Sequence, residues 1–279
     1  MISQDYFPTP ALREYVKYYH IRHFVFSNNM PVPFKPYAPR PEQTLAFYPR
    51  DPEFVEYVSG KEIIKRPSSM IMGQYTVRTN RHLGGRDFLV FFVEFQPGVL
   101  YRITGIPYHE LTNTFIDAES VFSKEIRLVN ERLSSTDCYN EMIKIVETFL
   151  LGLMQKSKKD FHPIDTVSNL IIDNPEYASI DWFAKEACLS PRQFERKFKE
   201  RMGINPRLFA RIVRFKNSFR MKNNCPGEDW LSIALACGYY DYQHLVKDYL
   251  EFTGVAPTNY FIQDMKAPER VFGLRDSYC

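Results

Sequence analysis

Over roughly the first 120 positions, apolar residues form short runs or alternate with polar ones. Representative runs are Gln43–Tyr48, Ser69–Tyr75 and Phe88–Phe95. Turn-forming pairs, among them Gly84-Gly85 and Pro97-Gly98, punctuate the apolar runs. Short apolar runs between Gly and Pro residues are typical of β-strands. We therefore expect this part of the chain to be mostly β structure.

The spacing of apolar residues changes near Ser120. From there they recur at intervals of three and four, as Val121, Phe122, Ile126, Val129 and Leu133, and then as Met142, Ile143, Val146, Phe149, Leu150 and Leu153. This spacing predicts helices. The face that carries Val146, Phe149, Leu150 and Leu153 can either pair with its copy in a dimer or pack on the β structure. Residues 156–160 break the pattern and predict a linker.

Beyond the linker the pattern is helical, and it contains an internal repeat. Small residues in the segment 184–189 recur fifty positions later in the segment 234–239. At an offset of 51, six further pairs match, namely Ser190 with Asp241, Phe194 with Leu245, Phe198 with Tyr249, Gly203 with Gly254, Pro206 with Pro257 and Phe209 with Tyr260. So many matches in one frame indicate two copies of one structural unit.

The repeated positions have physical roles at helix ends and faces. Ser190 and Asp241 are good N-caps, because their side-chain oxygens can accept hydrogen bonds from the first free amides of a helix. Phe194 and Phe198 are four residues apart and share a helix face, as do their counterparts in the second copy. The glycines and prolines that follow are helix-stop signals. A short helix, a tight turn and a capped second helix make a helix-turn-helix unit.

Charge is concentrated in the first copy. The whole chain of 279 residues has a formal net charge of +3, whereas residues 191–222 hold eleven basic residues against two acidic ones, a local charge of +9. A solvated helix face would explain this charge as well as DNA binding would. At 44% hydrophobic and 15% aromatic residues, the chain can fill two domain cores.

The cysteines and the length of the apolar runs indicate the cellular compartment of the protein. The five cysteines are odd in number and widely spaced, and we expect reduced thiols; they are Cys138, Cys188, Cys225, Cys237 and Cys279. No run approaches the roughly 18 apolar residues of a membrane span. We expect a cytoplasmic protein with no membrane partner.

Residues 165–265 resemble the DNA-binding domain of AraC/XylS-type transcription regulators. The resemblance lies in the segment from Ile180 to Lys199 and in the segment from Ile233 through Cys237-Gly238-Tyr239 to Pro257. The sequence departs from the family pattern at Cys188, where many members have glycine, and at Leu245, where phenylalanine is common.

The resemblance implies an α+β fold. An amino-terminal, mostly-β, cupin-like barrel with flanking helices would occupy residues 1–155, a linker 156–164, a double helix-turn-helix domain 165–265 and a tail 266–279. A linker helix over about 206–221, with Phe209, Ile212, Val213 and Phe219 on its buried side, would hold the two units at successive major grooves.

The resemblance also implies DNA-contacting residues. Base contacts would come from Arg192, Gln193, Glu195, Arg196, Tyr242, Gln243, Val246 and Lys247, because Arg can bind guanine, Gln adenine and Glu cytosine. Backbone contacts would come from Ser190, Lys197, Lys199, Arg201, Lys222 and Asp241. For the lysines, including Lys247, and for Arg201, phosphate contact is the competing role to base reading.

The sequence thus predicts a DNA-binding transcription regulator and not an enzyme, with no cofactor and no metal. The resemblance implies several partners. They are an operator in double-stranded DNA, RNA polymerase, a second copy of the chain in a homodimer, and either a small-molecule effector or a partner that acts through the amino-terminal domain. His20, His23, His82 and His109 show no metal-ligand spacing, and Cys188 and Cys237 are expected to be small core residues. The alternative is an enzyme or DNA-repair protein with an appended helix-turn-helix domain.

Overall fold

Two antiparallel sheets form the amino-terminal part of the computed structural model, which describes residues 1–57, 60, 62–177 and 179–274. Within these residues, a six-stranded sheet has the order β1-β2-β9-β4-β7-β10 and a four-stranded sheet the order β3-β8-β5-β6. The larger sheet contains β1 (Ile2–Tyr6), β2 (Val16–Val25), β4 (Gln43–Phe47), β7 (Ser69–Met72), β9 (Asp87–Phe95) and β10 (Phe115–Asp117). The smaller contains β3 (Lys35–Tyr37), β5 (Glu53–Tyr57), β6 (Ile63–Lys65) and β8 (Thr79–Leu83).

The two faces of the larger sheet bury different side chains, as the two-residue period of a strand requires. In β9, Leu89, Phe91 and Val93 face a core shared with helices, and Phe88 and Val90 belong to a second core between the sheets. The predicted apolar runs of β4, β7 and β9 are therefore buried on both faces. Because the two sheets do not close on each other, the barrel is open but cupin-like.

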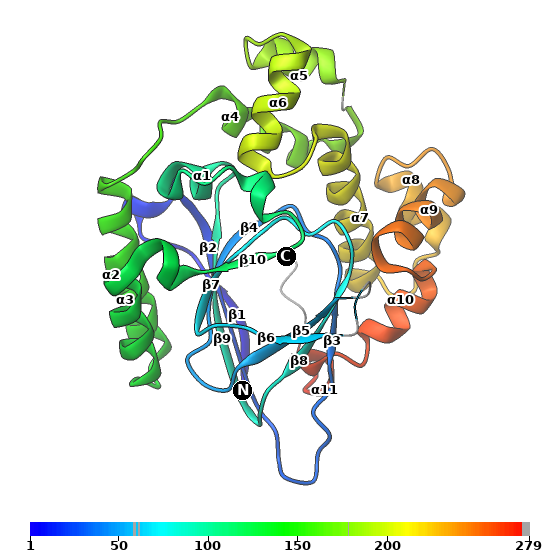
Figure 1. The fold of residues 1–279 in the computed structure, drawn as a ribbon. Coiled ribbons are helices and arrows are strands. Elements are labelled where there is room, and N and C mark those ends of the chain that lie inside the picture. The colour runs from blue at the N-terminus through cyan, green and yellow to red at the C-terminus, as the bar shows by residue number, and fades with distance from the viewer. Residues whose placement is uncertain (58–59, 61, 178, 275–279) are drawn as a thin grey trace.

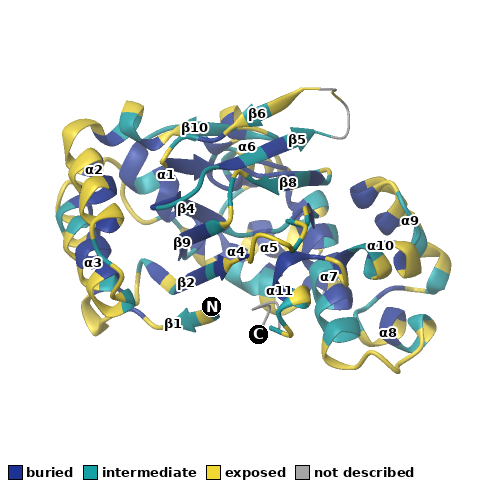
Figure 2. Ribbon diagram, turned by 90° about the horizontal axis from the view of Figure 1, so that it is seen from below, coloured by how far each residue is buried: buried dark blue, intermediate teal, exposed yellow. Residues whose placement is uncertain are grey.

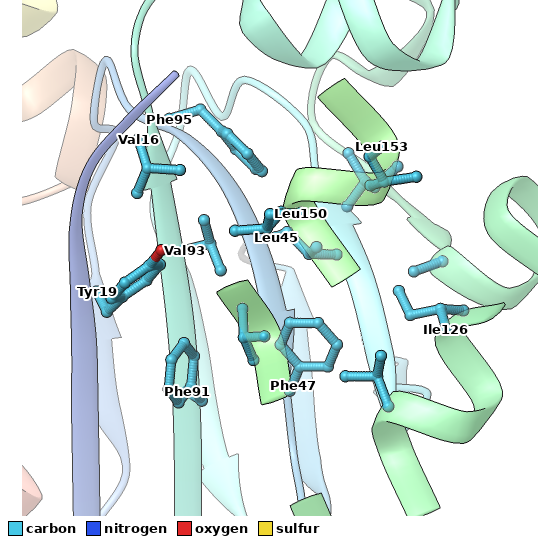
Figure 3. Close-up of a cluster of buried hydrophobic side chains, with 14 of the residues drawn as sticks. Val16, Tyr19, Leu45, Phe47, Phe91, Val93, Phe95, Ile126, Leu150 and Leu153 are labelled. Carbon is cyan, nitrogen blue, oxygen red and sulfur yellow. The ribbon is translucent and has the colours of Figure 1, made fainter. Parts of the chain in front are cut away.

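Helices α2 (Ala118–Ser134) and α3 (Tyr139–Gln155) cover the outer face of the larger sheet. Val146, Leu150 and Leu153 are buried in one cluster with residues of the sheet, and Figure 3 shows Leu150 next to Leu45 of β4. The apolar face proposed for dimer pairing is thus occupied within its own domain, which favours the packing alternative. The outward faces of α2 and α3 are exposed in Figure 2.

The carboxy-terminal part is helical (Figure 1). Its helices are α4 (Pro163–Asp173), α5 (Ile180–Glu186), α6 (Pro191–Met202), α7 (Pro206–Asn224), α8 (Trp230–Ala236), α9 (Tyr242–Thr253), α10 (Pro257–Asp264) and α11 (Pro268–Val271). Shorter helical elements are α1 (Val99–Thr104) and three 3₁₀ turns at Pro10–Leu12, Tyr108–Leu111 and Pro175–Tyr177. This arrangement confirms the predicted α+β fold.

Residues 156–162 of the predicted linker 156–164 lie between α3 and α4, and its last two residues form the first positions of α4. No helix or strand lies within residues 156–162, all of which the structure describes. Among the described residues, none of the helices combines the length and apolar character that crossing a bilayer requires.

Candidate nucleic-acid interface

The first helix-turn-helix unit consists of α5 and α6. Ser190 caps α6 by accepting a hydrogen bond from the Gln193 amide, and the Gln193 side chain binds back to Ser190, which completes a capping box. Phe194 and Phe198 are fully buried beside Phe183 of α5. The capped start and the buried face fix the direction of α6 and leave its opposite face in solvent.

The second unit, α8 and α9, repeats this construction. The Asp241 side chain accepts a hydrogen bond from the His244 amide at 2.8 Å and caps α9. Leu245 and Tyr249 take the places of Phe194 and Phe198 and are fully buried, packed in one cluster with Ile233. Both predicted N-caps and both predicted buried faces are therefore confirmed.

The long helix α7 joins the two units. Phe209, Ile212, Val213 and Phe219 are buried, as predicted. Arg211 of α7 binds Asp248 of α9 at 2.6 Å and Glu251 at 2.5 Å, which ties the linker helix to the second recognition helix. Pro206 and Pro257, expected to act as stops after α6 and α9, occupy the first position of α7 and α10, where a proline costs no helix hydrogen bond.

The turns of the two units share a backbone conformation that favours glycine. Gly238 has a φ of 75° in the second turn, and Cys188, its counterpart in the first, has a φ of 53°. Cys188 is exposed, so the expectation that it is a small core residue is wrong. Cys237 is half-buried and packs on the core, and Cys279 lies outside the described residues.

The residues predicted to contact bases lie at the starts of α6 and α9. Arg192, Gln193, Glu195 and Arg196 are exposed on α6. On α9, Gln243 and Lys247 are exposed, and Tyr242 and Val246 are half-buried. The structure therefore brings the predicted residues together in two groups, one on each helix.

The residues predicted to contact the DNA backbone do not form one surface. Lys199 is exposed, whereas Lys197 pairs with Glu200 at 2.9 Å. The ammonium group of Lys222 donates to the carbonyl oxygens of Pro226 and Glu228 and so holds the loop after α7. Ser190 and Asp241 serve as N-caps, the first through its hydroxyl oxygen and the second through Oδ1.

Arg201 departs from its predicted role. Its guanidinium is buried at the inner end of α6 and forms two hydrogen bonds of 2.6 Å with Asp165 of α4. An arginine so enclosed cannot reach a phosphate in this arrangement. Charge counting along the sequence placed it with the surface basic residues, because nothing in the local sequence reveals a partner 36 positions away.

Two exposed aromatic residues at the start of α9, Tyr240 just before the helix and His244 in its first turn, were not singled out from the sequence. Tyr240 is 87% exposed, and its ring lies 5.9 Å from that of His244, whose Nδ1 hydrogen-bonds the Asp241 carboxylate at 2.8 Å. Both flank the group formed by Gln243 and Lys247. The aromatic pair Tyr239-Tyr240 at the end of a turn was the available signal.

The histidines of the β domain are engaged with protein side chains. His20 contacts Asp5 and Arg22, His23 contacts Asp87 and Tyr139, and His82 contacts Glu56, while His109 is exposed. In the part of the chain that the structure describes, no three His, Cys, Asp or Glu side chains gather as metal ligands.

A group of buried charges connects the barrel to α7. Glu42 forms an ion pair with Lys216, and Glu94 lies beside them and 3.5 Å from Lys17. Burial, and after it repulsion from Glu42, raises the pKa of Glu94 to about 7. Although burial opposes ionisation of Glu42 too, attraction to Lys216 and Arg40 lowers its pKa. A charge network therefore holds the linker helix to the amino-terminal domain.

Further hydrogen bonds join each unit to the barrel. Gln43 donates to the carbonyl oxygen of Arg201 at 2.7 Å, and Tyr101 donates to Glu200 of α6. For the second unit, the Arg78 amide donates to the Phe252 carbonyl at 2.8 Å. Both helix-turn-helix units therefore rest directly on the amino-terminal domain.

Two family models match parts of the chain. One is described as a helix-turn-helix domain and matches residues 183–263, and the other is described as a domain of unknown function (DUF6597) and matches residues 4–117. No curated protein matches the chain significantly.

Solved structures share the fold. The 1.65 Å structure of ToxT from Vibrio cholerae is 12% identical, with 88% of this chain and 98% of that chain covered and a TM-score of 0.50. ToxT from V. cholerae strain SCE256 with a bound unsaturated fatty acid is 11% identical, with 88% and 95% covered and a TM-score of 0.51. The AraC-like transcriptional activator CuxR is 11% identical, with 70% of each chain covered and a TM-score of 0.25.

Proposed function

We propose that the chain is a DNA-binding transcription regulator of the AraC/XylS type, in which α6 and α9 enter two successive major grooves of an operator. One observation carries this proposal: both helices begin at a side-chain N-cap, bury one face in a common core and leave the residues of the first turns accessible. Recognition helices of this class contact base edges with their amino-terminal residues.

Arg196 and Lys247 are the proposed base-reading residues with the longest reach. The proposed base-contacting groups on α6 and α9 also include Arg192, Gln193, Glu195, Tyr242, Gln243 and Val246. We assign phosphate contact to Lys199, whose exposed ammonium has no competing carboxylate among the described residues, and leave Arg201 out of the interface. Lys197 and Lys222 would have to give up their present partners to bind phosphate.

We propose that residues 1–155 form a regulatory domain and that residues 165–265 form the DNA-binding domain. We propose that a small molecule acts through the amino-terminal domain. Hydrogen bonds and an ion pair join the barrel directly to α6 and α7. They support this proposal, because a ligand that moves the barrel residues would also move these helices. That ToxT has been solved with a fatty acid bound is consistent with it.

RNA polymerase and a second copy of the chain are further proposed partners. For the second copy, the accessible outer faces of α2 and α3, which include the exposed Leu128 and Leu151, replace the buried face considered first. Sedimentation at several concentrations would detect the dimer.

The proposed function can be tested by selecting bound duplexes from a random DNA pool with the full chain. We expect the selected sequences to contain two short preferred blocks whose centres are about one helical turn, roughly 10 to 10.5 base pairs, apart. A pool that remains random after repeated rounds of selection would contradict sequence-specific binding. One preferred block alone would contradict the role given to the second unit.

A further inference from the structure

The two recognition helices differ in charge. The second, α9, has one basic residue, Lys247, against two acidic ones, Asp248 and Glu251, whereas α6 has five basic residues against two acidic ones. A helix in the major groove lies between two phosphate backbones, and neutralisation of phosphates supplies a large share of the affinity of DNA-binding proteins. Cations that neutralise the backbone beside α9 therefore have to come from another element.

A cleft beside α9 brings such cations to the helix. It has a volume of about 680 Å³ and lies between α7 and α9, which Figure 1 shows side by side. Arg211 and Arg214 line the cleft from α7, and His244 and Lys247 line it from α9. Because an α-helix about 10 to 12 Å wide fills a major groove about 12 Å wide, elements that flank the helix face the phosphates. Arg211 and Arg214 are thus on the side of α9 where a backbone would pass.

Arg214 is the arginine of this cleft whose charge is not neutralised. Arg211, one turn earlier on α7, is held by Asp248 at 2.6 Å and by Glu251 at 2.5 Å. The half-buried Arg214 forms no ion pair with a carboxylate of the described residues, and its buried Nε has no hydrogen-bond partner among them. Its guanidinium makes one hydrogen bond within the described chain, from Nη1 to the Gly238 carbonyl oxygen at 3.3 Å. Since a guanidinium has five N–H donors, Arg214 keeps donors for a further ligand.

The turn between α8 and α9 holds the Arg214 side chain in place. The guanidinium carbon lies 5.1 Å from the centre of the Tyr239 ring, and the Tyr239 hydroxyl donates to Asp248 of α9 at 3.1 Å. Gly238, which accepts the hydrogen bond from Arg214, belongs to the same turn. Arg214 is therefore positioned relative to α9 before DNA binds, which reduces the entropy lost when a contact forms.

We propose that Arg214 binds a backbone phosphate of the operator in the cleft between α7 and α9. The linker helix then supplies the positive charge that α9 lacks, and Lys247 remains available for a base contact. The planar guanidinium suits this ligand, because its parallel N–H groups match the oxygens of a phosphate. The inference rests on the proposed function and adds a DNA contact from outside both recognition helices.

Salt-dependent titration of the full chain on a duplex selected from the random pool, and on a scrambled duplex, tests the proposal. Arg214→Met should weaken binding to both duplexes about tenfold, the loss expected for one charge-assisted hydrogen bond, and reduce the salt slope by about one unit. Arg214→Lys retains the charge and should keep the salt slope of the unmodified protein. Arg132→Met, on the exposed surface of α2, is the control and should change neither quantity.

Neutral methylphosphonate groups, placed one at a time along the backbone of the selected duplex, separate a phosphate contact from a structural role. At one position beside the second preferred block, the neutral group should weaken binding of the unmodified chain about tenfold and leave binding of Arg214→Met unchanged. If Arg214 only supports the turn, Arg214→Met and Arg214→Lys would weaken binding equally, and each methylphosphonate would affect the unmodified chain and Arg214→Met alike. This outcome would overturn the inference.

Unchanged affinity and salt slope in Arg214→Met would also overturn it, while recognition of bases by α6 and α9 would stand. The proposed function fails separately, if the unmodified chain shows no preference for the selected duplex over the scrambled one.

Discussion

Arg201 and Asp165 form a bidentate ion pair in which the side chains are 5% and 4% exposed. The pair joins α6 of the first helix-turn-helix unit to α4. It also packs against the barrel, since a Cβ added at Gly98, whose φ is 80°, would lie 2.0 Å from the Asp165 carboxylate. A single buried contact thus fixes the first recognition helix relative to two other elements.

Removing one partner of this pair should strongly destabilise the protein. We expect Asp165→Ala to lower the free energy of unfolding by about 3 to 5 kcal/mol, because it leaves the Arg201 charge buried and unpaired. Denaturant titration measures the change. The double variant Asp165→Leu with Arg201→Met is the control and should be far closer to the unmodified protein. A loss under 1 kcal/mol in the single variant would refute this account.

Glycine should stabilise the turn of the first helix-turn-helix unit at Cys188, because the second unit has Gly238 at the equivalent position. Cys188→Gly should raise the free energy of unfolding by about 1 kcal/mol, because relief of the left-handed strain exceeds the added entropy of the unfolded chain. Cys225→Gly is a matched control, since Cys225 is also exposed but has a φ of −127°. It should bring no gain. Equal effects of the two substitutions would contradict the strain argument.

The raised pKa of Glu94 predicts a pH-dependent stability. Since the folded value of about 7 lies above the ordinary value of 4.5, the folded state holds the proton more tightly, and stability is lost as pH rises from about 4.5 through 7. The Glu94→Gln side chain cannot ionise. The free energy of unfolding of this variant, relative to that of the unmodified protein, should therefore rise by on the order of 2 to 3 kcal/mol between pH 5 and pH 8. Unfolding curves at several pH values give this difference. A difference that stays constant with pH would show that Glu94 ionises normally.

Phe198 is the core anchor of the first unit. Phe198→Ala should cost about 3 to 5 kcal/mol, because the ring is fully buried against Phe194 and Phe209. Loss of specific DNA binding should accompany this destabilisation. Phe161→Ala, which removes an exposed phenylalanine before α4, serves as the control. Comparable losses in both variants would contradict the assignment of the core.

Local patterns carried the prediction of the helix-turn-helix units, because caps, buried faces and stops are encoded within a few residues of one another. Ser190, Phe194, Phe198 and their repeats could therefore be assigned before the structure. Contacts between distant segments could not be assigned in this way. The ion pair of Arg201 with Asp165 depends on which elements meet in space, and a single sequence holds no local record of that.

The central claim is that α6 and α9 recognise the base sequence of DNA. A comparison of variants at Arg196, a proposed base contact, and Lys199, a proposed phosphate contact, tests it most directly. We would titrate the unmodified protein, Arg196→Ala and Lys199→Ala on a selected site and on scrambled DNA over a range of salt concentrations. Arg196→Ala should weaken binding to the selected site by about 1 to 3 kcal/mol with little change on scrambled DNA. Lys199→Ala should weaken both alike and reduce the salt slope by about one unit. Equal affinity of the unmodified protein for selected and scrambled DNA would contradict the account.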